Sequence, residues 1–300
     1  MNILNILNNY GKMVKFSHTL FALPFAGLAM IIAILNTTLS KEELYLKSIL
    51  ILLCMVSARN AAMGFNRFVD KEIDKHNPRT KNRELPAGIL SNTSVITFTI
   101  LFSFIFIIST YFLNIFCFYA SIPTLFIILI YSYTKRFTWF CHYILGIGIG
   151  LAPSGAWTAI TGEISIIPFI WTMGLMFHIA GFDILYSTQD MEYDKMNNLY
   201  SIPSRFGLSL SLNIARINHL LAFSLLFYAG IISSMNNYYY IFLIIAGILF
   251  TIEHLMVNKN DLSKVPIAFF HINASISIVL FLGILFDKWN ELQLYMGNLK

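Results

Sequence analysis

The feature that most constrains this chain is a run of fifty residues, Leu85–Thr134, that contains no Asp, Glu, Lys or Arg. Similar apolar stretches recur along the chain, and about 20 such residues are enough to cross the hydrocarbon core of a bilayer. Only 12% of all residues are charged, which is about half the fraction typical of a soluble domain. The sequence therefore predicts an all-α protein that crosses a membrane several times, and it excludes a soluble core.

Nine of the apolar stretches are long enough to predict transmembrane helices. Their expected bounds are residues 16–36, 46–65, 93–113, 115–134, 139–160, 165–185, 213–234, 238–257 and 266–286. Asn114 alone separates the third stretch from the fourth, so eight helices are also compatible with the sequence. No soluble segment is long enough for a second domain, and we expect residues 1–300 to form a single one.

Lys and Arg are distributed unequally between the two sides of this predicted bundle. With the N-terminus inside, sixteen of the 20 lie on the cytoplasmic side and four lie outside: Lys41, Lys47, Lys288 and Lys300. This asymmetry predicts a cytoplasmic N-terminus and an external C-terminus. The absence of an Arg- and Ser-rich leader favours a bacterial inner membrane over a mitochondrial one. No exposed basic arm remains for nucleic acid, and no obligate protein partner is evident.

Charge of both signs gathers in NRFVDKEIDKHNPRTKNRELPAG, Asn66–Gly88, where ten of 23 residues are charged. Asn66, Asp70 and Asp74 are spaced four residues apart and would lie on one face of a helix. Two carboxylates and an amide are hard oxygen ligands that suit Mg²⁺. An acidic stripe at the end of a long uncharged helix is costly near lipid, which favours a functional site over a solvated loop.

The same stretch supplies cations suited to phosphate. Arg79 and Arg83 follow the acidic stripe in a proline-flanked loop, and guanidinium groups bind phosphate oxygens in a bidentate manner. Arg59 lies seven residues before Asn66 on the same helical face, inside a predicted span. We expect it to face an internal cavity, with a substrate anion or a site acid as its partner.

A second acidic stretch, DILYSTQDMEYDK, begins at Asp183. Asp183, Asp190 and Asp194 would share one face of a helix, which repeats the pattern of the first stretch. Both stretches follow a predicted span on the cytoplasmic side, as expected for two facing halves of one bundle. Two facing acidic stripes are suited to hold two Mg²⁺ ions around a diphosphate and to neutralise it as a leaving group.

Other polar residues give weaker signals. Tyr131 and Lys135, in YSYTKR, are one turn apart and precede Arg136, a pattern equally compatible with a site and with interfacial anchoring. His18 is expected to pack near the inner edge of the membrane or to line a substrate pocket. The cysteines and remaining histidines show no metal-ligand spacing. The GIGIG segment at 146–150 lies in an apolar span and predicts close helix packing instead of a phosphate loop.

Together these motifs resemble the UbiA family of intramembrane prenyltransferases. The matching segments are NRFVDKEID, NPRTKNRELPAG, YSYTK and DILYSTQDMEYD, in that order. KFSHTLFALPFA and ARNAAMGFNR are similar to the branch that acts on 4-hydroxybenzoate, or to its menaquinone-pathway relative. The resemblance covers nearly the whole chain. It implies a nine-helix bundle with a central cavity open to lipid, in which a polyprenyl group passes from its diphosphate to an aromatic acceptor.

The resemblance also implies roles for individual residues. The expected ligands of Mg²⁺ and the diphosphate are Asn66, Asp70, Asp74, Asp190 and Asp194. The expected catalytic set is Asp70, Asp74, Asp183, Asp190, Asp194, Tyr131 and Lys135. The expected substrate-binding set is Asn66, Arg59, Arg79, Arg83, Arg136 and His18.

Two alternative functions are compatible with the same motifs. The acceptor of the prenyl group could be a menaquinone-pathway precursor or a haem instead of 4-hydroxybenzoate. A transporter of an anionic solute, which is a different class of protein, would use the same cationic mouth. The predicted helix interiors carry almost no charge for a transport path, so the sequence favours chemistry on a lipid-borne polyprenyl diphosphate.

Overall fold

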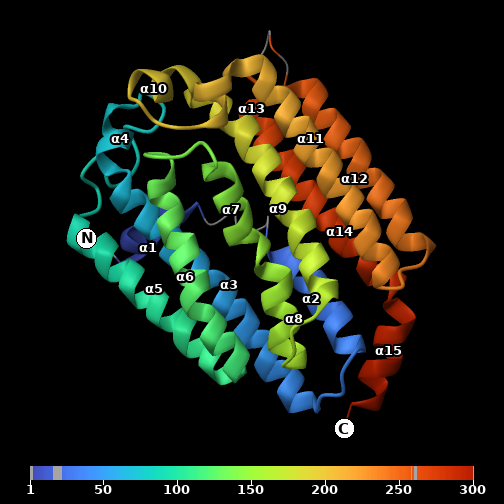
Figure 1. Ribbon diagram of the computed structural model, residues 1–300. Helices are drawn as coiled ribbons and strands as arrows, with labels where there is room; N and C mark the ends of the chain where they lie inside the picture. Colours follow the sequence, from blue (N-terminus) through green and yellow to red (C-terminus); the bar gives the residue numbers. More distant parts are fainter. Residues whose placement is uncertain (1–2, 16–21, 258, 260–261, 300) are drawn as a thin grey trace.

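The computed structural model describes all residues except 1–2, 16–21, 258, 260–261 and 300, and the described residues contain no strand (Figure 1). Its helices are α1 (Ile3–Val14), α2 (Leu23–Leu35), α3 (Lys41–Val69), α4 (Lys71–His76), α5 (Asn92–Leu113), α6 (Ile115–Thr134), α7 (Cys141–Gly150), α8 (Ala152–Thr161), α9 (Ile166–Ser187), α10 (Met191–Met196), α11 (Ile202–Ile232), α12 (Asn237–Met256), α13 (Val265–Ile267), α14 (Asn273–Asp287) and α15 (Trp289–Asn298). A 3₁₀ turn, Thr188–Asp190, joins α9 to α10, and a π-helical turn, Ala268–Ile272, joins α13 to α14. The predicted all-α class is confirmed.

Eight helical segments within the described residues are long and apolar enough to cross a membrane. They correspond in order to the second through ninth predicted spans. The first predicted span, 16–36, contains α2, whose 13 apolar residues fall short of the length that a full crossing requires. Within the described residues the bundle therefore has eight helices of membrane-spanning length and one shorter apolar helix, α2.

Asn114 decides between one long hydrophobic helix and two. Its backbone is extended, with φ of −174° and ψ of 170°, and interrupts the helical path between α5 and α6. Its side chain accepts a hydrogen bond from the Cys117 N–H (2.9 Å) and donates one to the Thr158 carbonyl on α8 (2.8 Å). This single polar residue therefore ends α5, caps α6 and ties the turn to a neighbouring helix.

Three helices extend beyond their predicted bounds at the end of the bundle that carries the acidic motifs. α3 continues to Val69, α9 continues through the 3₁₀ turn into α10, and α11 begins at Ile202. The spans predicted from hydrophobicity are shorter because the added turns are polar. The acidic residues consequently lie on helical turns instead of in loops, and helices hold side chains in more precise positions.

The glycines of α7 permit a close approach to α9. A Cβ atom at Gly146 would lie 2.6 Å from the Met176 carbonyl oxygen, and one at Gly150 would lie 3.1 Å from the Thr172 carbonyl oxygen. Backbone carbonyls cannot turn aside as flexible side chains do, so the helices can pack at this distance only with glycine at these positions. The predicted packing role of the GIGIG segment is confirmed.

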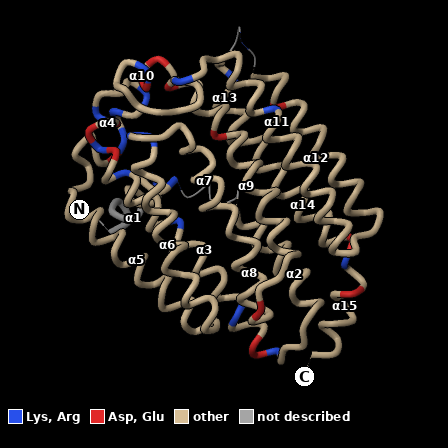
Figure 2. The backbone as a smooth tube through the Cα atoms, in the orientation of Figure 1, with Lys and Arg blue, Asp and Glu red and all other residues tan. Residues whose placement is uncertain are grey.

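Helices α3, α5 and α6 lie on one side of the molecule, and α9, α11, α12 and α14 lie on the other (Figure 1). Helices α2, α7 and α8 lie between the two groups. Charged residues gather at one end of the bundle around α4 and α10, a smaller group lies at the opposite end, and the middle is nearly bare of charge (Figure 2). α4 follows α3 of the first group, and α10 follows α9 of the second. The two short helices meet at the charged end.

Candidate active site

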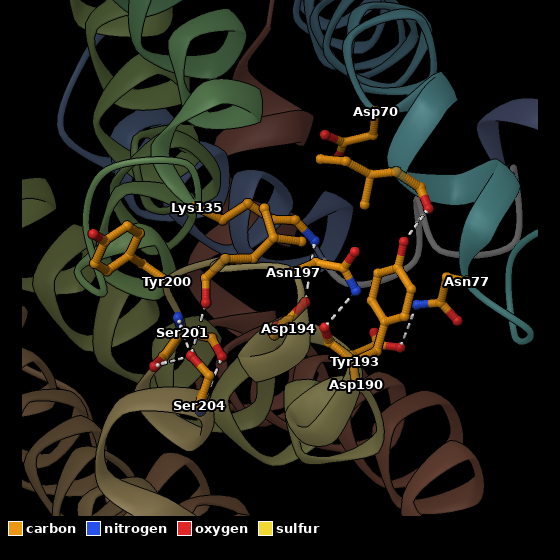
Figure 3. A network of polar contacts seen from close by, with 12 residues as sticks. Asp70, Asn77, Lys135, Asp190, Tyr193, Asp194, Asn197, Tyr200, Ser201 and Ser204 are labelled. Atoms are coloured by element: carbon orange, nitrogen blue, oxygen red, sulfur yellow. Dashed lines mark hydrogen bonds and ion pairs between the residues drawn. The ribbon is translucent and has the colours of Figure 1, made fainter.

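The two acidic motifs meet at the charged end of the bundle (Figure 3). Tyr193 of α10 donates a hydrogen bond from its hydroxyl to the Ile73 carbonyl in α4 (2.8 Å). Asn77 Nδ2 and Arg79 Nε, which follow α4, both donate to Asp190 Oδ1, each at 2.9 Å. Segments more than a hundred residues apart are thus joined directly, as predicted for two facing acidic stripes.

Four of the five acids predicted for the site each pair with one Lys or Arg side chain. The pairs are Asp70 with Arg136 (3.0 Å), Asp74 with Arg83 (2.7 Å), Asp190 with Arg79, and Asp194 with Lys135 (3.8 Å). The cluster is therefore electrically balanced. Among the described residues, no three His, Cys, Asp or Glu side chains are grouped closely enough to hold a metal ion in this arrangement.

Asp70 lies at the junction of α3 and α4 and is buried. Its Oδ2 accepts a hydrogen bond from Asn66 Nδ2 (2.9 Å), one turn earlier. Burial raises the pKa of the Asp70 carboxyl, and the charges of Lys135 and Arg136 only partly oppose this. Arg136 also donates to the carbonyls of Val69 (2.8 Å) and Ser132 (2.7 Å), so it holds α3 and α6 together at this point.

Lys135 reaches from the end of α6 between the two acidic motifs (Figure 3). Burial lowers the pKa of its ammonium group, but the carboxylates of Asp194, Asp70 and Asp190 outweigh this and raise the pKa, so the group stays charged. Its contact with Asp194 is loose at 3.8 Å, and the Asp194 Oδ1 atom is buried without a hydrogen-bond partner. Because the loose ion pair with Lys135 is not a hydrogen bond, this oxygen keeps the capacity to bind a cation.

The Arg79 guanidinium contacts two partners, Asp190 and Tyr186. It forms a bidentate pair with Asp190, and its Nη1 donates to the Tyr186 hydroxyl (2.9 Å) while the guanidinium lies 5.2 Å from that ring's centroid. The pKa of Arg79 is raised: burial alone would lower it, but the hydrogen bonds to Asp190 and nearby negative charge outweigh burial. The Tyr186 ring in turn lies 4.1 Å from that of Phe269, in the π-helical turn.

Tyr186 is a site residue that the sequence reasoning missed. The only signal in the sequence was its position one turn after Asp183, which places both on the same helical face.

Asn273 holds in place the π-helical turn that carries Phe269, the neighbour of the Tyr186 ring. Its Nδ2 donates to buried Glu253 (2.8 Å) and lies 3.2 Å from the Phe269 carbonyl oxygen.

Asp183 is set apart from the four acid–cation pairs. His142 Nε2 accepts a hydrogen bond from the Ile202 N–H (3.1 Å), which assigns the proton to Nδ1 and makes it the donor to Asp183 Oδ2 (2.7 Å). His142, one of the histidines without metal-ligand spacing, therefore orients Asp183, which lines the central cavity.

A cavity of about 800 Å³ extends from this site into the apolar interior of the bundle. On α3 its wall is a stripe spaced by three and four residues: Ile51, Cys54, Met55, Ala58, Arg59, Ala62, Met63, Asn66 and Arg67. Tyr131, Tyr186 and Phe269 also line it. The cavity joins the charged cluster to apolar side chains in the middle of the bundle.

Arg59 lines the cavity, as predicted. Its Nη2 lies 3.4 Å from the carbonyl oxygens of Val14 and Lys15, and among the described residues it forms no ion pair with a site acid. The alternative of a buried acid–Arg59 pair is therefore wrong. His18, the other candidate for this wall, lies outside the described residues.

Lys15 and Arg67, which the sequence reasoning did not assign to the site, join Arg59 on this side of the cavity. Arg67 is buried and donates to the Met13 carbonyl (3.2 Å) and to Asn66 Oδ1 (3.2 Å). Burial and the positive charges of Arg67, Arg83 and Arg79 lower the pKa of Lys15 to about 8. Among the described residues, none of these three cations forms an ion pair with an acid, so this wall suits an anionic group of a substrate.

A sequence description of the UbiA prenyltransferase family matches residues 19–275. The chain is 28% identical over 244 residues to a protein of Nitrosomonas eutropha named 4-hydroxybenzoate octaprenyltransferase, covering 80% of this chain and 83% of that protein. It is 26% identical over 228 residues to a protein of the same name from Francisella tularensis subsp. novicida, covering 76% and 80%.

Solved structures share the fold. The apo structure of a UbiA homolog from Aeropyrum pernix K1 matches with a TM-score of 0.81 at 27% identity, covering 90% of this chain and 98% of that chain. The structure of a UbiA homolog from Archaeoglobus fulgidus bound to GPP and Mg²⁺ matches with a TM-score of 0.68 at 18% identity, covering 92% and 99%. At this lower identity the likeness concerns the fold alone.

Proposed function

Because this chain belongs to the UbiA prenyltransferase family, we propose that it transfers a polyprenyl group from polyprenyl diphosphate to 4-hydroxybenzoate in ubiquinone biosynthesis. The observation that carries the proposal is the meeting of two acid–cation motifs at the entrance of a long apolar cavity. A charged head and an apolar tail in one substrate match these two environments. The names of the bacterial relatives support this choice of acceptor over a menaquinone-pathway precursor or a haem.

The donor atoms at the charged end fit Mg²⁺. Carboxylate and amide oxygens are the ligands that this ion prefers, and the buried Asp194 Oδ1 has no hydrogen-bond partner. Asn66, Asp70, Asp74, Asp190 and Asp194 would hold the ion, and the Mg²⁺-bound structure of a family relative supports its use. When bound, Mg²⁺ would neutralise charge on the departing diphosphate.

The cations of the four pairs differ in whether they are free to leave their carboxylate and bind the diphosphate. Arg79 and Arg83 come from the segment after α4, outside the membrane helices, and are suited to turn from carboxylates to diphosphate oxygens. Lys135 is held only loosely at 3.8 Å from Asp194 and would do the same. Arg136 is bound to two backbone carbonyls, so its role is to hold Asp70 in place.

The acceptor carboxylate fits the cationic wall formed by Lys15, Arg59 and Arg67. The allylic C–O bond of the donor breaks and the diphosphate leaves with the bonding electrons. The ring carbon ortho to the phenol oxygen forms the new C–C bond, and the displaced ring proton passes to Asp183, which lines the cavity and is oriented by His142. Tyr131 and the apolar walls exclude water, which would otherwise capture the prenyl cation.

The protein is an integral membrane protein. We place it in a bacterial inner membrane with its N-terminus and the acidic motifs at the cytoplasmic face, in agreement with the excess of Lys and Arg at the charged end. Polyprenyl diphosphate enters with its head at this face and its tail in the bilayer.

Product formation by the purified protein tests the proposal. Octaprenyl diphosphate, Mg²⁺ and 4-hydroxybenzoate should yield prenylated hydroxybenzoate, and EDTA or Asp70→Asn should abolish it. Glu72→Gln, at an exposed neighbouring position, is the matched control and should retain activity. Product with another aromatic compound but not with 4-hydroxybenzoate would contradict the acceptor, and a folded protein without any prenylated product would contradict the enzyme.

A further inference from the structure

The turn that joins α13 to α14 is π-helical and comprises Ala268–Ile272. A π turn contains about one residue more than an α-helical turn, which rotates the residues before it by about 100° around the helix axis. α13 lies near the charged end of the bundle (Figure 1), and Phe269 in the turn lines the central cavity. The turn therefore aims an aromatic ring of the cavity wall in a different direction from a regular helix, and such turns occur frequently at functional sites.

Two fully buried polar side chains, Asn273 and Glu253, fix this turn. Asn273 Nδ2 donates to Glu253 Oε1 on α12 (2.8 Å), and it lies 3.3 Å from the Ala268 carbonyl oxygen and 3.2 Å from that of Phe269. A π turn draws its carbonyls away from the regular helical pairing, so the Asn273 amide supplies a donor where these carbonyls need one. Glu253 holds that amide in place from the neighbouring helix.

Glu253 requires an explanation of its own, because an acidic side chain inside a membrane bundle is costly and usually has a function. It is 0% exposed, and none of the ion pairs of the described residues joins it to Lys or Arg. Its Oε2 lies 3.5 Å from His219 Nδ1 and has no hydrogen-bond partner among the described residues. The acceptor that it provides for Asn273 is therefore the contact that links this acid to the rest of the molecule.

The turn is connected to the charged site through stacked rings. The Phe269 ring lies 4.1 Å from the Tyr186 ring, at an angle of 31°. The Tyr186 hydroxyl accepts a hydrogen bond from Arg79 Nη1 (2.9 Å), while Nε and Nη2 of the same guanidinium contact Asp190. The two nitrogens on Asp190 form the fork that a diphosphate would use, and Tyr186 holds the third. The position of the Tyr186 ring thus sets the direction in which Arg79 presents its fork.

We propose that Glu253 and Asn273 are positioning residues that orient Arg79 toward the diphosphate of the donor. By fixing the π-helical turn they hold Phe269 against Tyr186, and Tyr186 in turn holds Arg79. In the part of the chain that the structure describes, neither Glu253 nor Asn273 lines the cavity, so both act through other residues. The inference rests on the proposed prenyl transfer and adds to it two residues that lie outside both acidic motifs.

The test measures kcat/KM for octaprenyl diphosphate at saturating Mg²⁺ and 4-hydroxybenzoate. Asn273→Leu and Glu253→Leu each remove the hydrogen bond between the two side chains, and each should lower kcat/KM about fivefold, as expected for Tyr186→Phe. Glu253→Gln keeps an oxygen that accepts from Asn273 and should stay within twofold. Ser277→Ala is the matched control and should also stay within twofold. Ser277 is equally buried on α14, but its hydroxyl donates to the Asn273 carbonyl (2.9 Å), which faces away from the turn along the helix.

A double-mutant cycle separates positioning from a general loss of packing. If Asn273 acts through Tyr186, Asn273→Leu should lower kcat/KM less than about twofold further in the Tyr186→Phe protein, because the contact with Arg79 is already lost there. A general loss of packing would instead multiply the two effects. Phe269→Leu leaves the bond between Asn273 and Glu253 in place and should show the same non-additivity with Tyr186→Phe. It replaces Asn273→Leu if thermal unfolding shows that this variant is not folded.

Multiplied losses in both cycles would overturn the inference, and so would a folded Asn273→Leu protein with unchanged kcat/KM. A Glu253→Gln protein as impaired as Glu253→Leu would also overturn it, because the hydrogen bond would then not account for the effect. Failure of the unmodified protein to prenylate 4-hydroxybenzoate would instead refute the proposed function.

Discussion

Replacing Arg79 with lysine separates the effect of charge from that of geometry at the meeting point of the two motifs. Lysine keeps the positive charge, but it cannot reproduce the planar fork that contacts Asp190 through two nitrogens and Tyr186 through a third. We therefore expect Arg79→Lys to lose at least two of three hydrogen bonds while the net charge of the site stays the same.

The size of the effect follows from the exposure of the partners. The Arg79 side chain is 30% exposed and that of Asp190 is 13% exposed, so solvent screens part of each interaction. The same fork of two nitrogens would bind the diphosphate oxygens once Arg79 turns from Asp190, and lysine cannot reproduce it. At about 1 kcal/mol per hydrogen bond, the loss of two is about 2 kcal/mol. This corresponds to about a 30-fold fall in kcat/KM, since about 1.4 kcal/mol is tenfold in rate.

Steady-state rates of prenyl transfer in detergent, measured at saturating Mg²⁺, check this value. Arg216→Lys is the matched control, because Arg216 is exposed and its one hydrogen bond among the described residues is to Asn213 Oδ1 (3.0 Å). It should change kcat/KM by less than about twofold. An Arg79→Lys enzyme within threefold of the unmodified one would refute the reasoning, because charge alone would then suffice.

Three further predictions follow from the site and its supporting helices. The pKa of Lys15 is about 8, so its charge is lost as pH rises through that value, and kcat/KM for 4-hydroxybenzoate should fall above pH 8. Lys15→Arg should remove this fall, and an identical pH profile in the variant would contradict the role of Lys15. Tyr186→Phe removes one hydrogen bond to a guanidinium and should lower kcat/KM about fivefold, and an unchanged value would exclude Tyr186 from the site. Gly146→Leu forces a Cβ to 2.6 Å from the Met176 carbonyl and should destabilise the protein by about 1–3 kcal/mol in thermal unfolding, whereas Gly155→Ala meets open space and should not; equal melting temperatures would contradict the packing argument.

Hydrophobicity predicted the fold well because lipid imposes one strong constraint on each span. The spacing of Asn66, Asp70 and Asp74 likewise predicted a shared face, and the structure places them on successive turns across the α3–α4 junction. The helix ends were predicted too short, because the turns that carry Asp190 and Asp194 are polar and are held by contacts to the other motif. The Tyr193 bond to the Ile73 carbonyl, between residues 120 apart, is one such contact.

The partners of the acids were not predictable from spacing. Asp183 follows the same helical pattern as Asp190, yet it pairs with His142, because the crossing of α7 and α9 brings that ring next to it. Lys15 and Arg67 are ordinary cytoplasmic cations in the sequence. Only the packing of α1 against α3 brings them to the cavity beside Arg59.

The central claim is that the two acidic motifs act as one site on one diphosphate, and a double-mutant cycle tests it most directly. Asp74→Asn and Asp194→Asn remove one carboxylate from each motif, and each should lower kcat about 100-fold or more with a radiolabelled donor. If both motifs act on the same diphosphate, kcat of the double variant should be less than about tenfold below kcat of the less active single variant. The effects of residues that act as a unit are not additive. A double variant whose loss equals the product of the two single losses would show that the motifs act independently and would contradict the account.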